Sequence, residues 1–247
     1  MGERDNAERR VMTIYGLGRL PFEADDRDRS YTAQRLEAMI ALGLAAPVEW
    51  ANVNHVLDQG EYATCVAASV LGLLNTDDER HNDPAFTDDD ILPFFATIEG
   101  GSLTRGALIR NGLKAAQRNG LIVAYALLIN EDEMESWLQQ HGPVLVGSTW
   151  TKSMSNPQGD IVMVDRTDEA SGHAWFFHGY DPNYLHGSQS WGEDWGDHGY
   201  FRISRTSFSG LYQVGGECWA VVQAIPLPMP VPLSCWQQVK RFLRGGQ

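Results

Sequence analysis

Several features that would indicate a particular class of protein are scarce or absent in this chain of 247 residues. It has no run of about 18 consecutive apolar residues, so we expect no transmembrane helix. Its charged start lacks the apolar core of a signal peptide, which predicts a cytoplasmic protein at synthesis, with later delivery by a non-classical route left open. Basic residues are few, with 19 Lys and Arg against 32 Asp and Glu, for a net charge of −13. We therefore expect no binding to nucleic acid or to an anionic membrane.

Cysteine is also scarce, with only Cys65, Cys218 and Cys235 in the whole chain. This small, odd number argues against a disulfide framework and suits a reducing compartment. The cysteines and histidines also lack the spacing of a zinc site, because Cys65 has no second cysteine two to four residues away. We predict neither a bound metal nor a cofactor, and the oligomeric state stays open.

The composition that remains is that of a globular protein, with 43% hydrophobic and 21% charged residues. Apolar periodicity and capping residues predict helices in the first half, over 64–75, 88–98 and 105–119. Short β-rich segments predict strands in the second half, at 121–128, 143–150, 161–166, 173–180 and 199–204. Helices followed by strands of an antiparallel sheet indicate an α+β fold with two lobes.

The two ends of the chain differ from its middle, and we divide the chain accordingly. Residues 1–46 are an N-terminal extension, extended on the surface over 1–30 and with one amphipathic helix over 31–44. A helical lobe over 47–125 and a β-rich lobe over 126–224 follow. Residues 225–247 combine a proline-rich linker with a basic tail.

Cys65 begins the apolar helix of the first half, in the sequence Gln59-Gly60-Glu61-Tyr62-Ala63-Thr64-Cys65. The free N–H groups and partial positive charge of a helix N-terminus favour a thiolate over a thiol. This position would suit a nucleophile, although on position alone an inert cysteine in a buried helix is the better explanation.

His173 is the histidine best placed to act as a base for a thiol nucleophile. It follows Ser171-Gly172 and opens a predicted strand, although a histidine at the edge of the core would also fit there. Gln189 lies 16 residues further on, and its amide oxygen could accept a hydrogen bond from one ring nitrogen. The nearby Trp191 could shield that bond from water.

Together these segments resemble the papain-like cysteine peptidases over about residues 47–222. The resemblance rests on five blocks in the order of that family: Gln59-Gly60 with Cys65, Gly100-Gly101-Ser102, His141-Gly142-Pro143-Val144, Ser171-Gly172-His173-Ala174, and the run from Trp191 to Tyr200. It implies a helical N-terminal lobe and a barrel-like antiparallel C-terminal lobe, with the active-site cleft between them.

The resemblance also implies roles for individual residues. Cys65 would be the nucleophile, His173 the base, Gln189 its orienting partner and Gln59 the donor to the oxyanion. A second set would bind the extended peptide or protein substrate: Gly100, Gly101, Gly172 and Trp191. The reaction implied is hydrolysis of a peptide bond through a thiolate–imidazolium pair and an acyl-enzyme.

Three positions depart from the family pattern. Gln189 stands where the family has Asn, Val66 where many relatives have Trp, and Tyr62 where a disulfide-forming Cys is common. The longer side chain of Gln189 leaves open a second hypothesis, a catalytically degenerate protein that binds peptides. Acyl transfer or deamidation at the same site is a further alternative, because these reactions also pass through a thioester.

Overall fold

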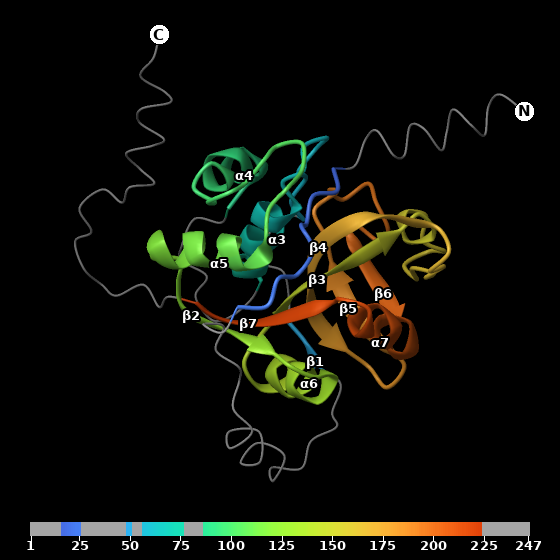
Figure 1. Ribbon diagram of the computed structural model, residues 1–247. Helices are drawn as coiled ribbons and strands as arrows, with labels where there is room; N and C mark the ends of the chain where they lie inside the picture. Colours follow the sequence, from blue (N-terminus) through green and yellow to red (C-terminus); the bar gives the residue numbers. More distant parts are fainter. Residues whose placement is uncertain (1–15, 26–47, 51–55, 77–85, 224–247) are drawn as a thin grey trace, which may run out of the picture.

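The computed structural model describes residues 16–25, 48–50, 56–76 and 86–223 (Figure 1). Three helices, α3 (Cys65–Leu74), α4 (Asp88–Phe95) and α5 (Ile109–Arg118), form one group. They match the helices predicted over 64–75, 88–98 and 105–119. The predicted helix over 31–44 and the predicted linker and tail over 225–247 lie outside the described residues. None of the described helices is long and apolar enough to cross a membrane.

The helix α3 is the centre of this group because it is apolar nearly all round. Nine of its ten residues are buried, and it packs against α4, α5 and the sheet. The acidic first turn of α4 is capped locally, since the backbone N–H of Thr87 donates to the carboxylate of Asp90 at 2.9 Å.

The second group is an antiparallel sheet whose strands run in the order β2-β7-β3-β4-β5-β6, with β1 paired to β4. The strands are β1 (Val48–Glu49), β2 (Ile122–Leu128), β3 (Val144–Thr151), β4 (Glu169–Tyr180), β5 (Tyr184–Ser188), β6 (Tyr200–Ser204) and β7 (Glu217–Gln223). Two helices, α6 (Glu131–Gln140) and α7 (Arg205–Gln213), pack against this sheet, and a short 3₁₀ turn, η1 (Ser153–Ser155), follows β3. The α+β fold expected from the sequence is confirmed.

Some local predictions were wrong. The segment 161–166 is not a strand, because Ile161 makes only isolated bridges to Gln158 and Arg202. The helices α6 and α7 and the strands β5 and β7 were not predicted. Strand β2 runs across the expected boundary between residues 125 and 126.

The strand β4 separates two hydrophobic cores. Its residues alternate between them, so that Ala174 and Phe176 pack around α3, whereas Trp175 and Phe177 pack with the aromatic side chains of the sheet. The side chains at the boundary between the two groups therefore come from α3, from β4 and from the segment that lies between them.

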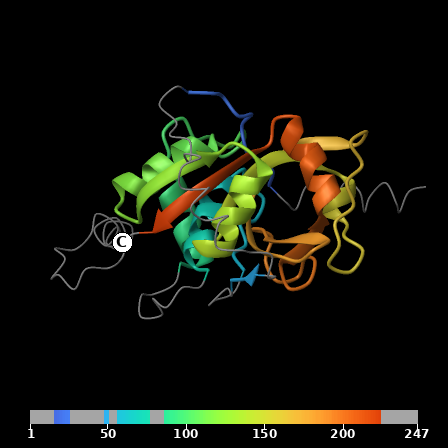
Figure 2. The same ribbon diagram turned by 90° about the horizontal axis from the view of Figure 1, so that it is seen from below.

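That segment is residues 16–25, which we call the covering segment. In Figures 1 and 2 it runs as an extended blue trace along the boundary between the helices and the sheet. It is extended, as predicted for residues 1–30. The prediction that it lies on the surface holds for residues 21–25, which are exposed or half-buried, but was wrong for residues 16–20. Gly16, Gly18 and Arg19 are buried, because the backbone of this segment forms hydrogen bonds with both groups of elements.

Candidate active site

Cys65 is the first residue of α3 and is fully buried. Its sulfur lies beside the backbone of Ala174 in β4 and of Gly18 in the covering segment, both of which make hydrogen bonds to it. The N-terminus of α3, the strand that carries His173 and the covering segment therefore meet at this thiol.

His173 and Gln189 are brought together as the sequence suggested. The ring Nε2 of His173 and the Oε1 of Gln189 are 3.1 Å apart, and both residues are buried. The ring of Trp191 lies 5.0 Å from the imidazole, and that of Trp150 also lies at 5.0 Å. The extra methylene of Gln189 therefore does not prevent the bond, and the indole rings keep water away from it.

The second ring nitrogen of His173 has no hydrogen-bond partner among the described residues. Because Nε2 is taken by the amide oxygen of Gln189, the neutral imidazole carries its proton there and leaves the lone pair of Nδ1 free. Nδ1 is thus the atom of this residue that can exchange a proton with another group.

Both groups are neutral in this form of the protein. Burial raises the pKa of the Cys65 thiol to about 11, although hydrogen bonds from the backbone of Ala174, Gly18 and Val66 and the charge of Arg19 oppose the shift. Burial also lowers the pKa of His173 to about 3, against the opposing bond to Gln189. The desolvation imposed on the site therefore outweighs the helix N-terminus at Cys65.

Gln59 is buried six residues before Cys65, and its amide is fixed at both ends. Its oxygen accepts a hydrogen bond from the hydroxyl of Ser190 at 2.5 Å. Its nitrogen donates to the carbonyl of Gly16 at 2.9 Å and to that of Tyr62 at 2.7 Å. The amide nitrogen of Gln59 thus already binds a peptide carbonyl, supplied by the covering segment.

The covering segment pairs with a wall on each side. On the helical side, Gly18 accepts from the N–H of Ala107 at 2.8 Å, and Leu20 donates to the carbonyl of Ala107 at 2.9 Å. On the sheet side, Arg19 donates to the carbonyl of Gly172 at 3.1 Å. The segment is therefore bound as an extended peptide would be.

Glycine is required on both walls by this close approach. A Cβ atom on Gly106 would lie 1.3 Å from the carbonyl oxygen of Gly18, and one on Gly172 would lie 2.2 Å from that of Arg19. Gly100 and Gly101, which the sequence suggested for this role, do not reach the segment. Gly101 packs against Ile98 and Phe95, and Gly100 is exposed.

Two functional candidates were missed, Arg19 and Glu217. The Nε and Nη2 of Arg19 lie 2.9 and 2.8 Å from the Oε1 of Glu217, and Nη2 also donates to the carbonyl of Gly215 at 3.1 Å. Both side chains are almost completely buried. The only signal in the sequence was a lone Glu at the start of an apolar strand, which also fits a solvated strand end.

Comparison with known proteins finds similarity to cysteine proteases over part of the chain. The model of the papain family cysteine proteases matches residues 110–221, which include His173, Gln189 and Glu217. Cathepsin Z of Onchocerca volvulus is 30% identical over 90 residues, which are 34% of this chain and 29% of that protein. The chain thus matches less than a third of the length of this relative.

Solved structures extend the likeness to most of the chain. Xylellain, a cysteine protease from Xylella fastidiosa, superimposes with a TM-score of 0.71 at 21% identity, covering 86% of this chain and 97% of that one. Digestive procathepsin L2 from the larval midgut of Tenebrio molitor gives a TM-score of 0.65 at 17% identity, covering 87% and 80%. The family model covers less than half of the chain, and these solved structures, at 21% and 17% identity, show that the chain has the fold of the papain-like cysteine proteases.

Proposed function

We propose that this protein hydrolyses peptide bonds, with Cys65 as the nucleophile and His173 as the base. The observation that carries the proposal is the meeting of a cysteine at the N-terminus of α3 with the strand of His173, whose ring is held by Gln189 at 3.1 Å. An extended peptide segment bound beside this cysteine gives it further support.

The proton path follows from the hydrogen bond of the imidazole. With Nε2 bonded to Gln189, Nδ1 takes the proton of the Cys65 thiol, and the resulting thiolate attacks the carbonyl carbon of the substrate. The imidazolium then returns this proton to the nitrogen of the leaving amine as the C–N bond breaks. Water, deprotonated by the same ring, hydrolyses the thioester and regenerates the thiol.

The negative charge of the tetrahedral intermediate needs donors that are fixed in advance. The amide nitrogen of Gln59 is suited to this, because the hydroxyl of Ser190 holds the amide oxygen and so directs the nitrogen toward a peptide carbonyl. The backbone N–H of Cys65 would be the second donor. Loss of one such donor reduces the rate by about 10²–10³-fold in other enzymes.

A second candidate function, peptide binding without hydrolysis, is favoured by one observation. In this form the site already holds a peptide, the covering segment, and burial keeps both Cys65 and His173 neutral. Such a protein would bind extended peptides at the boundary and release them unchanged.

Hydrolysis of a denatured protein substrate by purified variants separates the two functions. Cys65→Ala and His173→Ala should each abolish cleavage while the thermal unfolding curve is retained. Cys218→Ala is the matched control, because Cys218 is an equally buried thiol whose sulfur contacts Met134 in the sheet core. Cleavage that persists in Cys65→Ala would exclude the proposed mechanism, and no cleavage by the parent chain under any condition would favour the binding protein.

A further inference from the structure

The carboxylate of Glu217 is a buried charge at the boundary between helices and sheet. Its side chain is 2% exposed, and it belongs to β7, while its charged partner Arg19 comes from the covering segment, 198 residues away in sequence. The remaining oxygen, Oε2, accepts from the indole N–H of Trp219 at 2.7 Å. The indole of Trp219 therefore fixes one oxygen of this carboxylate, and the guanidinium of Arg19 binds the other.

The surroundings are shaped for a long basic side chain. A Cβ atom on Gly147 of β3 would come within 2.8 Å of the Nε of Arg19, and one on Gly172 of β4 would lie 3.5 Å from its Cδ. The carbonyl of Gly215 accepts the Nη2 that Glu217 also binds. We call the space bounded by Gly147, Gly172, Gly215 and Glu217 the Arg19 site.

The Arg19 site lies next to the candidate nucleophile. The charge of Arg19 is close enough to lower the pKa of the Cys65 thiol, and the adjacent Gly18 makes a hydrogen bond to the same sulfur. In any peptide bound as the covering segment is, the residue whose side chain enters the Arg19 site is therefore close to the backbone group that lies beside Cys65. The side chain that the Arg19 site accepts therefore affects which peptides bind beside Cys65.

A buried carboxylate without a cation is unfavourable. Burial raises the pKa of Glu217, whereas the charge and hydrogen bonds of Arg19, the bond from Trp219 and the more distant charge of Arg110 all lower it. Arg110 is itself engaged by the covering segment, at the carbonyl of Glu23 and the carboxylate of Asp25. When the covering segment leaves, the carboxylate requires either water or another cation.

We propose that the Arg19 site, through Glu217, makes this protein prefer peptides that place an arginine or lysine side chain there, and that Arg19 occupies the site as a stand-in for such a side chain. This inference rests on the proposed function only in treating the boundary as the place where peptides bind. The net charge of −13 acts in the same direction, because it attracts basic peptides.

Equilibrium binding tests the preference without requiring hydrolysis. The protein is the 247-residue chain with Cys65→Ala, which removes turnover, and Arg19→Ala, which vacates the site. The probes are fluorescein-labelled alanine-based octapeptides that carry one arginine, or one citrulline, at each position in turn. Citrulline has nearly the same shape as arginine but no charge, so fluorescence anisotropy isolates the contribution of the cation.

At one peptide position, we expect arginine to bind at least tenfold more tightly than citrulline. Adding Glu217→Gln should reduce this ratio below threefold, because the amide oxygen still accepts from Trp219 but carries no charge. Glu217→Asp, which keeps the charge, should retain part of the preference, and this variant also answers the objection that Glu217→Gln disturbs folding.

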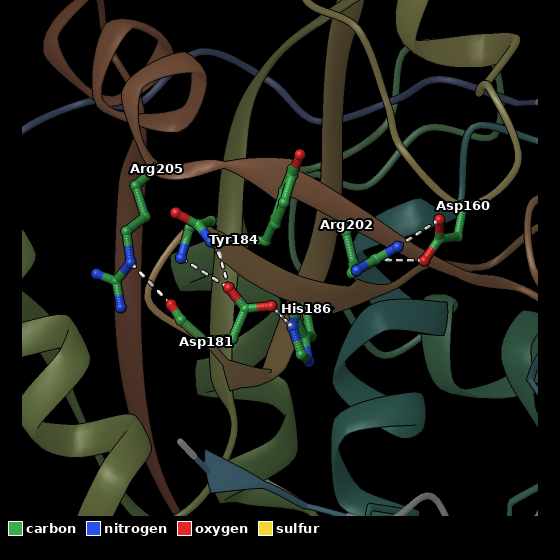
Figure 3. A network of polar contacts seen from close by, with 7 residues as sticks. Asp160, Asp181, Tyr184, His186, Arg202 and Arg205 are labelled. Carbon is green, nitrogen blue, oxygen red and sulfur yellow. Dashed lines mark hydrogen bonds and ion pairs between the residues drawn. The ribbon is translucent and has the colours of Figure 1, made fainter. Parts of the chain in front are cut away.

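The matched control is Asp160→Asn. The Asp160–Arg202 ion pair joins β6 to the loop between η1 and β4, at the end of the sheet opposite β2 and β7, and its side chains are 28% and 38% exposed (Figure 3). This variant should leave the arginine preference unchanged. A ratio below threefold at every position, or a preference that survives Glu217→Gln, would overturn the inference.

The two proposals fail separately. Arginine preference in the binding assay without cleavage by the Cys65 chain would contradict only the peptidase function. Cleavage of peptides without any preference for arginine would contradict only the role of Glu217.

Discussion

Arg19→Ala should uncover Cys65 without unfolding the protein. Arg19 and Glu217 form a buried pair whose side chains are 4% and 2% exposed. Removing one partner of such a pair typically costs about 3–5 kcal/mol, since the other charge stays buried and unpaired. In Arg19→Ala the carboxylate of Glu217 can be hydrated only when the covering segment leaves. The substitution therefore destabilises mainly the form in which the segment covers Cys65.

The expected size of the effect follows from that cost. The segment keeps its backbone hydrogen bonds to Ala107 and Gly172, which the substitution does not remove. A destabilisation of the covered form by about 3 kcal/mol corresponds to a roughly 100-fold larger uncovered fraction, at about 1.4 kcal/mol per factor of ten. The uncovered fraction should therefore rise by two orders of magnitude as long as it remains the minor form.

Alkylation by iodoacetamide under native conditions measures this fraction, with mass spectrometry of peptides to separate the two described cysteines. The rate at Cys65 should rise about 100-fold in Arg19→Ala, while the rate at Cys218, buried in the sheet core, stays unchanged. Arg205→Ala is the matched control, because its pair with Glu135 is 28% and 32% exposed, and such pairs contribute little. A rise below threefold at Cys65, or a parallel rise at Cys218, would refute the reasoning.

Three further predictions concern the same site. Burial lowers the pKa of His173 from 6.5 to about 3, so covering is fully favoured above pH 6.5 and is lost as the pH falls below it; hydrogen exchange at the Arg19 amide, corrected for its intrinsic rate, should increase about tenfold per pH unit there, and pH-independent protection would contradict this. Gly106→Ala should uncover Cys65 by its clash with Gly18, seen as faster alkylation, whereas Gly120→Ala, whose Cβ meets nothing, should not. Gln189→Ala should lower kcat by about 10-fold or more and Gln189→Asn by less, and equal rates for Gln189→Ala and the parent chain would show that this residue does not orient the imidazole.

The parts of the fold that could be predicted from the sequence are those set by neighbouring residues. The apolar run that begins at Cys65 can only be a buried helix, and the alternation within 173–180 makes a strand between two cores. By contrast, α6 and α7 are short and mostly polar, and their packing against the sheet decides their helical state.

The same distinction between local and long-range contacts applies to the candidate site. His173 and Gln189 are 16 residues apart around one strand pair, so their hydrogen bond was within reach of sequence reasoning. The approach of Gly106 to the covering segment was not predicted, because the two adjacent glycines Gly100 and Gly101 gave the stronger local signal. Only the three-dimensional course of the covering segment shows which glycine a peptide backbone approaches.

The pair of Arg19 and Glu217 could not be predicted, because its members are 198 residues apart and each alone fits an exposed charge. Its position links two properties that could otherwise vary independently, the covering of Cys65 and the choice of peptide. If one carboxylate governs both, Glu217→Gln should raise the alkylation rate of Cys65 and also remove the arginine preference of the uncovered site. Measuring both in one set of variants decides the point. A variant of Glu217 that loses the preference but keeps Cys65 fully covered would show that the backbone bonds alone hold the covering segment.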